Sequence, residues 1–233
     1  MTDPLGRPFD HRHITVPKTA RYAVMGSFDA KLTEVWIVCH GHGQLAGRFL
    51  SRFTPLERED RLFIAPEGLS RYYLDPAGVH GPESPVGATW MTREDREVEI
   101  ADQARYLGLV YKEVFERVDR AAVRLWVLGF SQGVATVARW LSGAARVTIA
   151  ADRVVLWAGM LPPELEASGA LALAARAPVT MVVGSSDEFA TSTVVAAQEA
   201  ALRELGVPFK TQHFEGGHDL SDSALMELSA SDG

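Results

Sequence analysis

The chain has 233 residues, of which 47% are hydrophobic and 23% are charged, as is usual for a globular protein with a sizeable core. Its net charge of -7 gives no electrostatic reason to expect nucleic acid or an anionic membrane as a partner. The single cysteine, Cys39, excludes an internal disulfide and fits a reducing compartment. Neither a signal core nor an apolar run of roughly 20 residues is present. We therefore predict a soluble, cytoplasmic protein that forms one domain over residues 1–233, without stable membrane insertion.

Strands and helices alternate along most of the chain. Residues 11–16 and 21–27 are β-like runs and predict an N-terminal antiparallel hairpin. Strands are expected at 33–39, 61–65, 124–130, 153–157, 178–183 and 209–215, and helices at 44–53, 94–118, 134–145 and 191–205. Residues 67–93, rich in glycine and proline, predict a long functional loop. This order predicts an α/β fold whose central sheet is mostly parallel, with helices on both faces and ligand sites at the carboxyl ends of the strands.

One serine stands where a buried strand turns sharply into a helix. The sequence Gly129-Phe130-Ser131-Gln132-Gly133 follows the apolar run 124–128 and has the Gly-x-Ser-x-Gly pattern of a nucleophile elbow. Glycines suit such a turn because the strand and helix backbones come too close for a Cβ atom. Ser131 is therefore a candidate nucleophile, and the alternative is a polar residue in an ordinary turn.

An acid and a histidine follow Ser131 at the ends of later strands. Asp187 ends the strand at 178–183, and His218 follows the strand at 209–215. The order Ser131, Asp187, His218 is the chain order of α/β-hydrolase triads. Asp187 could instead be a turn or capping residue, with Glu188 as the acid, and His218 could be a surface histidine.

The segment His40-Gly41-His42-Gly43 follows the first buried strand. An oxyanion hole needs two backbone N–H groups, and we expect them to belong to His42 and Gln132. His40 and His42 could also be ordinary loop residues or a zinc-binding pair, although no carboxylate or cysteine stands nearby at a familiar ligand spacing. We predict no metal and no cofactor.

A dinucleotide-binding site is a rival interpretation. Gly41-x-Gly43-x-x-Ala46 matches the fingerprint Gly-x-Gly-x-x-Gly/Ala between a strand and a helix, and Glu67 stands roughly where a ribose-binding acid is expected. The predicted hairpin before the motif counts against it, because this fingerprint normally follows the first strand of its domain. It also leaves Ser131, Asp187 and His218 without a role.

Several segments together resemble the phospholipase/carboxylesterase group of α/β-hydrolases, which includes the acyl-protein thioesterases. They are residues 38–43, 63–66, 128–133, 184–187 and 217–218, and the Gly-Phe-Ser-Gln-Gly form is more specific than the bare elbow pattern. The resemblance implies an α/β-hydrolase core without a large cap domain, and hydrolysis of carboxylic esters or thioesters without a cofactor. By matching position it supports Ser131, Asp187 and His218 as the triad and His42 and Gln132 as the oxyanion hole.

The sequence therefore predicts a serine hydrolase that cleaves an acyl ester or thioester through an acyl-enzyme on Ser131. Tyr72, Tyr73, Trp90 and Met91 either line its substrate pocket or pack the long loop onto the domain. A homodimer is a reasonable default for the assembly. The alternative from another class is a catalytically silent α/β-hydrolase scaffold that binds a small ligand or a protein.

Overall fold

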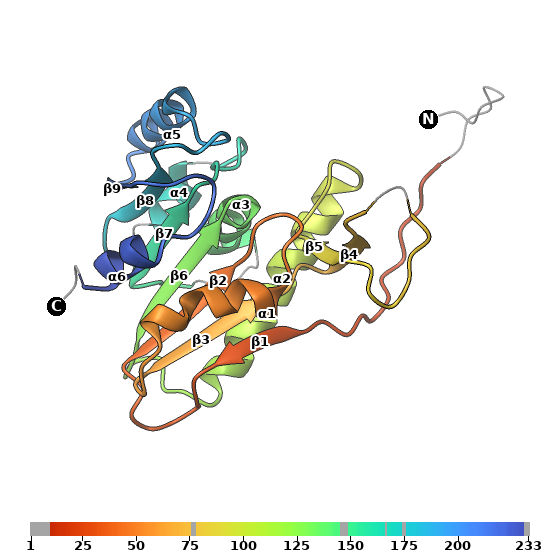
Figure 1. Cartoon of the computed structure of the whole chain (residues 1–233), viewed down its shortest axis with the longest axis horizontal. Helices are drawn as coiled ribbons and strands as arrows, with labels where there is room; N and C mark the ends of the chain where they lie inside the picture. The colour runs from red at the N-terminus through yellow and green to blue at the C-terminus, as the bar shows by residue number, and fades with distance from the viewer. Residues whose placement is uncertain (1–9, 76–77, 145–148, 166, 174–175, 231–233) are drawn as a thin grey trace.

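A seven-stranded mixed sheet forms the centre of the computed structural model, which describes residues 10–75, 78–144, 149–165, 167–173 and 176–230 (Figure 1). The strand order is β1-β3-β2-β6-β7-β8-β9, and every neighbouring pair is parallel except β1 and β3. The strands are β1 (Tyr22–Met25), β2 (Glu34–Cys39), β3 (Arg61–Pro66), β6 (Arg124–Phe130), β7 (Arg153–Trp157), β8 (Val179–Gly184) and β9 (Phe209–Phe214). The expected strands after residue 30 are thus present, within a residue or so of their predicted bounds.

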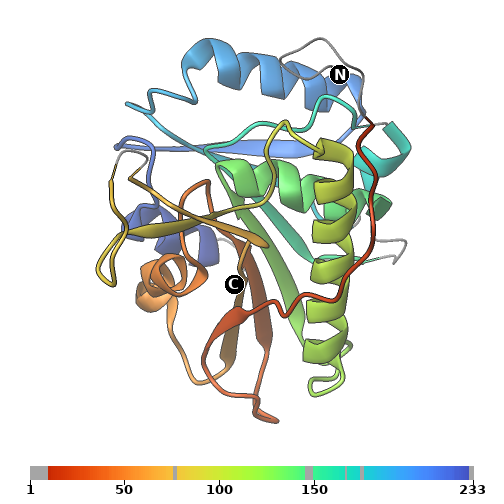
Figure 2. The same cartoon turned by 90° about the vertical axis from the view of Figure 1, so that its right-hand side faces the viewer.

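Helices cover both faces of this sheet (Figures 1 and 2). Side chains alternate along β2, so Val35 and Ile37 join one core cluster while Trp36 and Val38 join the other. The first cluster packs against α2 (Arg96–Phe115), α3 (Gln132–Arg139), α4 (Ala167–Leu173) and α5 (Ser192–Glu204). The second packs against α1 (Ala46–Leu50), the 3₁₀ helix η1 (Ser51–Leu56) and α6 (Asp222–Ala230). A π-helical turn, η2 (Trp140–Ala144), follows α3.

The predicted N-terminal hairpin is wrong. Residues 10–20 contain no strand, and β1 pairs instead with β3, with Tyr22 opposite Pro66. The run at 11–16 has only two apolar side chains, and both stay in solvent, Ile14 at 86% and Val16 at 65% exposed. Pairing of β1 with residues 11–16 would bury little apolar surface, whereas pairing with β3 gives β1 backbone hydrogen bonds to a strand of the buried sheet. The antiparallel strand is therefore the edge of the main sheet.

The predicted long loop at 67–93 contains a β-hairpin of its own. Strands β4 (Ser70–Tyr73) and β5 (Val86–Thr89) pair antiparallel in a separate two-stranded sheet. Short strands separated by glycines and prolines give little periodic signal, which is why the sequence alone indicated a loop. Residues 76–77 of this segment, like 1–9, lie outside the described part of the chain.

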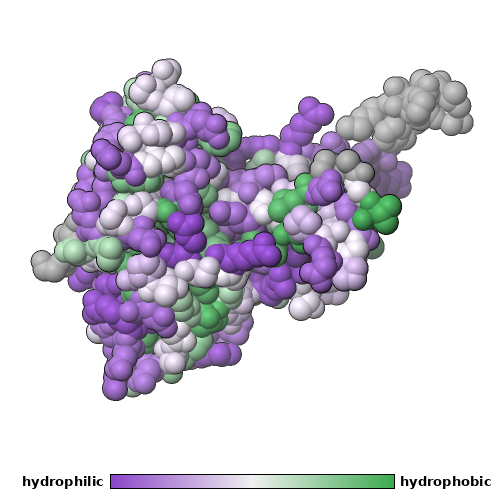
Figure 3. All heavy atoms as spheres, viewed as in Figure 1, coloured by the Kyte–Doolittle hydropathy of each residue, from purple (hydrophilic) through white to green (hydrophobic). Residues whose placement is uncertain are grey.

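Hydrophilic residues cover most of the face seen in Figure 3, where the exposed apolar residues of the described chain form small separate patches. None of the described helices has the length and apolar character needed to cross a membrane.

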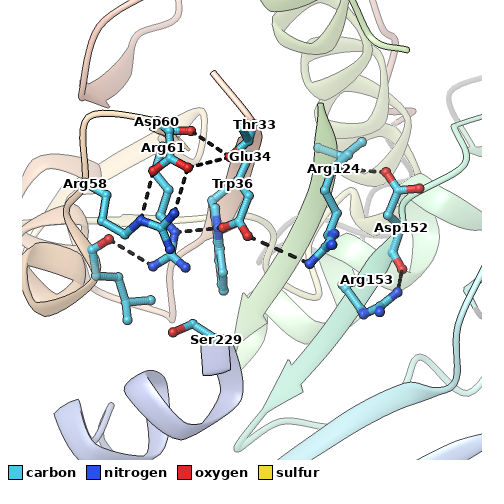
Figure 4. Close-up of polar contacts among 12 residues, drawn as sticks. Thr33, Glu34, Trp36, Arg58, Asp60, Arg61, Arg124, Asp152, Arg153 and Ser229 are labelled. Carbon is cyan, nitrogen blue, oxygen red and sulfur yellow. Dashed lines mark hydrogen bonds and ion pairs between the residues drawn. The ribbon is translucent and has the colours of Figure 1, made fainter. Parts of the chain in front are cut away.

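A buried ion pair joins β2 and β3 at their amino ends (Figure 4). The Arg61 Nε atom lies 2.7 Å from Glu34 Oε2, and both side chains are nearly out of solvent. Trp36 Nε1–H donates to the same carboxylate oxygen at 3.1 Å, and Arg61 also donates to the Leu56 carbonyl at 3.1 Å. Arg124 also lies near Glu34, with 3.9 Å between Nη1 and Oε1, so Glu34 has two cationic partners, whereas removing Glu34 would leave the buried Arg61 charge without its counterion.

We expect Glu34→Ala to lower the free energy of unfolding by about 3–5 kcal/mol, because Arg61 would remain buried and uncompensated. Urea denaturation followed by circular dichroism would measure this change. The control is Glu116→Ala, which removes an exposed partner of Lys112 at 3.8 Å and should change the stability by less than about 0.5 kcal/mol. Equal effects of the two variants would contradict a structural role for the buried pair.

Candidate active site

The candidate functional residues meet at one edge of the sheet. His42 follows β2, Ser131 follows β6, Asp187 follows β8 and His218 follows β9. These strands are parallel, so their carboxyl ends lie at the same edge. Ligand sites of open α/β sheets are found at this edge.

Ser131 has a backbone conformation that L-residues rarely adopt, with φ 52° and ψ -117°. Such conformations cost on the order of 1–3 kcal/mol and persist only where the surroundings enforce them. The two flanking glycines are required because the backbones come very close here. A Cβ on Gly129 would lie 2.4 Å from the Gly133 carbonyl oxygen, and a Cβ on Gly133 would lie 2.2 Å from the Cys39 carbonyl oxygen. The turn therefore has the geometry expected of a nucleophile elbow.

A chain of hydrogen bonds connects Ser131 to a buried carboxylate. His218 Nε2 lies 2.9 Å from Ser131 Oγ, and His218 Nδ1 lies 2.8 Å from Asp187 Oδ2. The Asp187 side chain has no exposed surface, whereas Glu188, the alternative acid, is exposed. Asp187 Oδ2 only accepts, so Nδ1 carries the ring hydrogen and Nε2 is left to accept the serine proton.

Asp187 is also held by its own turn. Its Oδ1 atom accepts hydrogen bonds from the backbone N–H groups of Phe189 and Ala190, both at 2.8 Å. Asp187 is thus a turn residue, as the alternative interpretation held, whether or not it is also the acid of a triad. One oxygen shapes the loop after β8, and the other orients His218.

His40 has a structural role. It is fully buried and stacks on Trp90, with 4.8 Å between ring centroids. Its Nδ1 atom lies 2.7 Å from the Gly41 carbonyl, and its Nε2 atom accepts from the Gly68 N–H at 3.0 Å. The Gly41 oxygen can only accept and the Gly68 N–H can only donate, so the ring is neutral with its hydrogen on Nδ1. Both nitrogens are occupied, which argues against the zinc-binding pair.

Glu67, the acid required by the dinucleotide interpretation, is engaged elsewhere. It is buried, and its two oxygens accept from Arg21 at 2.7 and 3.0 Å. The Ala46 N–H at the start of α1 also donates to Glu67, at 3.1 Å. The carboxylate therefore holds the first turn of α1 against the chain before β1. Its position leaves the fingerprint at Gly41 without a ribose-binding partner.

An apolar cavity of about 530 Å³ opens beside Ser131. Its polar lining comes from His42, Ser131, Gln132 and His218. The rest of its wall is apolar and comes from α3, α5 and the loops after β7 and β8: Ala135, Ala158, Gly159, Met160, Phe189, Ala190 and Val194. Met160 and Phe189 are 58% and 64% exposed, which is unusual for side chains of this size and places apolar surface at the cavity.

The four predicted pocket residues do not line this cavity. Trp90 is buried and donates its ring N–H to the His40 carbonyl at 2.7 Å, and Tyr73 stacks on His80 with centroids 3.9 Å apart. Met91 borders a smaller cavity beside α2, and the Tyr72 hydroxyl lies 2.6 Å from His42 Nε2. Of the four residues, Trp90 fits best the alternative prediction that these side chains pack the segment onto the domain.

The sequence reasoning missed the residues that do form the apolar wall. The loop after β7 contains Gly159 and Met160, and the loop after β8 contains Asp187 and Phe189. Both loops lie at the same edge of the sheet as the triad candidates. The rule that placed Ser131 and Asp187 at the carboxyl ends of strands would have identified these loops too.

A larger, open cleft of about 1060 Å³ lies at the opposite end of β6 and β7. Arg120 lines this cleft and donates to Asp152 Oδ2 at 2.8 Å and to the carbonyls of Ala150 and Val123 at 2.6 and 2.9 Å. Figure 4 shows the Arg124 guanidinium directed at Glu34, 3.9 Å away, and Arg153 donating to the Asp152 carbonyl at 2.8 Å. The contacts of Arg120 hold the segments before β6 and β7 together, and we assign the cleft no chemistry.

The fold and this edge of the sheet define an α/β-hydrolase, and the described residues form no cap domain over the sheet. A profile described as Phospholipase/Carboxylesterase matches residues 20–231, and the chain belongs to this family. A comparison with curated protein sequences gave no match.

Solved structures of similar fold include several hydrolases. Acyl-protein thioesterase 2 from Zea mays shares 19% identity at a TM-score of 0.64, covering 92% of this chain and 100% of that one. A carboxylesterase from Mesorhizobium loti shares 16% at 0.65, covering 92% and 95%. A carboxylesterase from Bacillus cereus shares 16% at 0.60, covering 90% and 91%. At these identities the likeness bears on the fold alone.

Burial lowers the pKa of His40 below its ordinary value of about 6.5. We therefore expect its ring carbon signals, followed by NMR, to titrate with a midpoint below about 6.5, the ordinary value for histidine. In the unfolded chain the histidine binds a proton at about pH 6.5, so the stability that neutral His40 supplies should be lost as the pH falls below that value. A titration midpoint at or above that value would contradict the assignment.

Proposed function

We propose that this chain is a serine carboxylesterase or thioesterase that acts through an acyl-enzyme on Ser131. The observation that carries the proposal is the continuous hydrogen-bond chain from Asp187 through His218 to Ser131 Oγ, with Ser131 in a strained turn. Membership in a family of carboxylesterases and thioesterases supports it. A serine with only a structural role would require neither the hydrogen-bonded connection to buried Asp187 nor a rarely adopted backbone conformation.

In the first half of the proposed reaction, Ser131 Oγ attacks the acyl carbonyl while His218 Nε2 takes its proton. Asp187 remains ionised and stabilises the imidazolium that forms. His218 then gives the proton to the leaving oxygen or sulfur, which departs as an alcohol or thiol. Water attacks the acyl-enzyme in the same way and releases the carboxylic acid.

The negative oxygen of each tetrahedral intermediate needs two donors. Gln132 is the first residue of α3, where the backbone N–H has no carbonyl of its own helix to bond and the helix dipole is positive. His42 lines the same cavity from the loop after β2. The backbone amides of these two residues form the proposed oxyanion hole.

The cavity favours a neutral, apolar acyl group. Apart from the catalytic side, its wall consists of alanine, glycine, valine, methionine and phenylalanine residues. A charged acyl chain would lose its hydration there without gaining a partner. An alkyl chain gains up to about 0.8 kcal/mol for each methylene that it buries.

We expect a fluorophosphonate probe to label the wild type covalently, because phosphonylation uses the same activated serine. Ser131→Ala should abolish labelling and ester hydrolysis, and Asp187→Asn should lower kcat by about 10⁴ through loss of the required tautomer. Labelling is read by mass spectrometry and hydrolysis with a p-nitrophenyl ester. A wild type that stays unlabelled and inactive would instead support the silent scaffold.

A panel of straight-chain p-nitrophenyl esters would test the cavity as the acyl site. We expect kcat/KM to rise by up to about fourfold per methylene until the cavity is full. Ala135→Leu adds volume to the wall on α3 and should lower kcat/KM for longer chains more than for acetate. The matched control, Ala197→Leu on the exposed side of α5, should leave the profile unchanged. Identical profiles for both variants would show that the acyl chain binds elsewhere.

A further inference from the structure

The β4–β5 hairpin is in direct backbone contact with the loop that carries His42. The Gly43 N–H donates to the Ala88 carbonyl at 2.8 Å, and the Ala88 N–H donates to the Gln44 carbonyl at 3.2 Å. A Cβ on Gly87 would lie 2.3 Å from the Gly43 oxygen, so no other residue fits there without movement. The end of β5 therefore fixes the position of the His42 loop.

The residues just after β5 hold the other side of the proposed oxyanion hole. The Trp90 N–H donates to Gln132 Oε1 at 3.1 Å, and Gln132 Nε2 donates to the Met91 carbonyl at 2.8 Å. A backbone N–H only donates and a carbonyl only accepts, so the side-chain amide of Gln132 has one orientation. The first residue of α3 is thus tied to the same hairpin as His42.

Thr89 stands at the junction between these two sets of contacts. It is the last residue of β5 and is buried, and its Oγ1 atom lies 3.1 Å from both His42 Nδ1 and Gln132 Oε1. The same hydroxyl lies 3.0 Å from the Met91 carbonyl. It can accept from the His42 Nδ1–H while it donates to one of the two oxygens. In that arrangement the Tyr72 hydroxyl, at 2.6 Å, donates to His42 Nε2.

We propose that Thr89 is a positioning residue that sets the spacing of the His42 and Gln132 amides through the side chains of both residues. This inference rests on the proposed esterase function. The two amides come from loops 90 positions apart in the sequence, and the Thr89 hydroxyl is a single group in contact with both side chains. Oxyanion stabilisation depends on donors that are already in place before charge develops. Thr89 does not line the cavity, so it acts through these neighbours and not on the substrate.

The test compares Thr89→Val, which keeps the shape and removes the hydroxyl, with Thr89→Ser, which restores it. Thr180→Val is the matched control, since Thr180 is a buried threonine on β8 away from this junction. With p-nitrophenyl acetate we expect Thr89→Val to lower kcat about tenfold at nearly constant KM, less than the ~10²–10³ that loss of a whole donor costs. Thr89→Ser should recover most of the loss, and Thr180→Val should behave as wild type.

Inhibition by a boronic acid provides a second measurement, which should not change if Thr89 has only a structural role. The tetrahedral adduct of the boronic acid with serine places an oxygen in the oxyanion hole, so Thr89→Val should weaken inhibition by about the factor that it takes from kcat/KM. Tyr72→Phe, at a half-exposed position, removes the other contact to His42 and should also lower kcat without raising KM. This second variant tests the coupling even if Thr89→Val unfolds.

Each outcome separates the two proposals. An inactive wild type that no fluorophosphonate labels would overturn the esterase function and this inference with it. An active wild type whose kcat and boronate inhibition are unchanged in both Thr89→Val and Tyr72→Phe would overturn the positioning role alone. So would a Thr89→Ser variant as slow as Thr89→Val, or a loss that appears only in KM.

Discussion

Close approach of backbones at the carboxyl edge of the sheet is the constraint on which the site depends. A Cβ on Gly159 would lie 2.2 Å from the Ser131 carbonyl oxygen, and one on Gly184 would lie 2.5 and 2.6 Å from those of Gly216 and Gly217. These contacts join the end of β7 to the elbow and the end of β8 to the His218 loop. Any side chain at these glycines would push apart segments whose spacing allows the 2.8 and 2.9 Å hydrogen bonds of His218.

The sheet and the order of the candidate triad could be predicted because the signals are local. Each central strand is a run of apolar residues that tolerates burial on both faces, as in β8, where all six residues are buried. The residue after such a run lies at the carboxyl edge whatever its distant neighbours are. Ser131, Asp187 and His218 could therefore be placed at one edge before any contact between them was known.

The pairing of edge strands and the packing of the long segment depend on distant partners, and the sequence did not reveal them. Nothing in residues 11–16 shows that β3 already has a partner in β1. Nothing near Trp90 shows that its ring fits on His40 in the core and not in a pocket. The four residues predicted for a substrate pocket lie outside the cavity beside Ser131 for this reason: aromatic residues in an irregular segment suggest exposure, whereas the burial of each side chain depends on how the segment packs on the sheet.

The groups proposed for chemistry and for substrate selection come from partly separate elements. The donors of the proposed oxyanion hole are held by the β4–β5 hairpin, whereas the apolar wall comes from α3, α5 and the loops after β7 and β8. Asp187 connects the proposed triad with the apolar wall. Its Oδ1 accepts from the N–H groups of Phe189 and Ala190, which line the cavity, and its Oδ2 holds His218. The turn that presents Phe189 to the cavity is thus the turn that fixes the acid. In the proposed enzyme, side chains on α3 or after β7 could change substrate preference on their own, whereas a backbone shift at Phe189 would also disturb the orientation of His218.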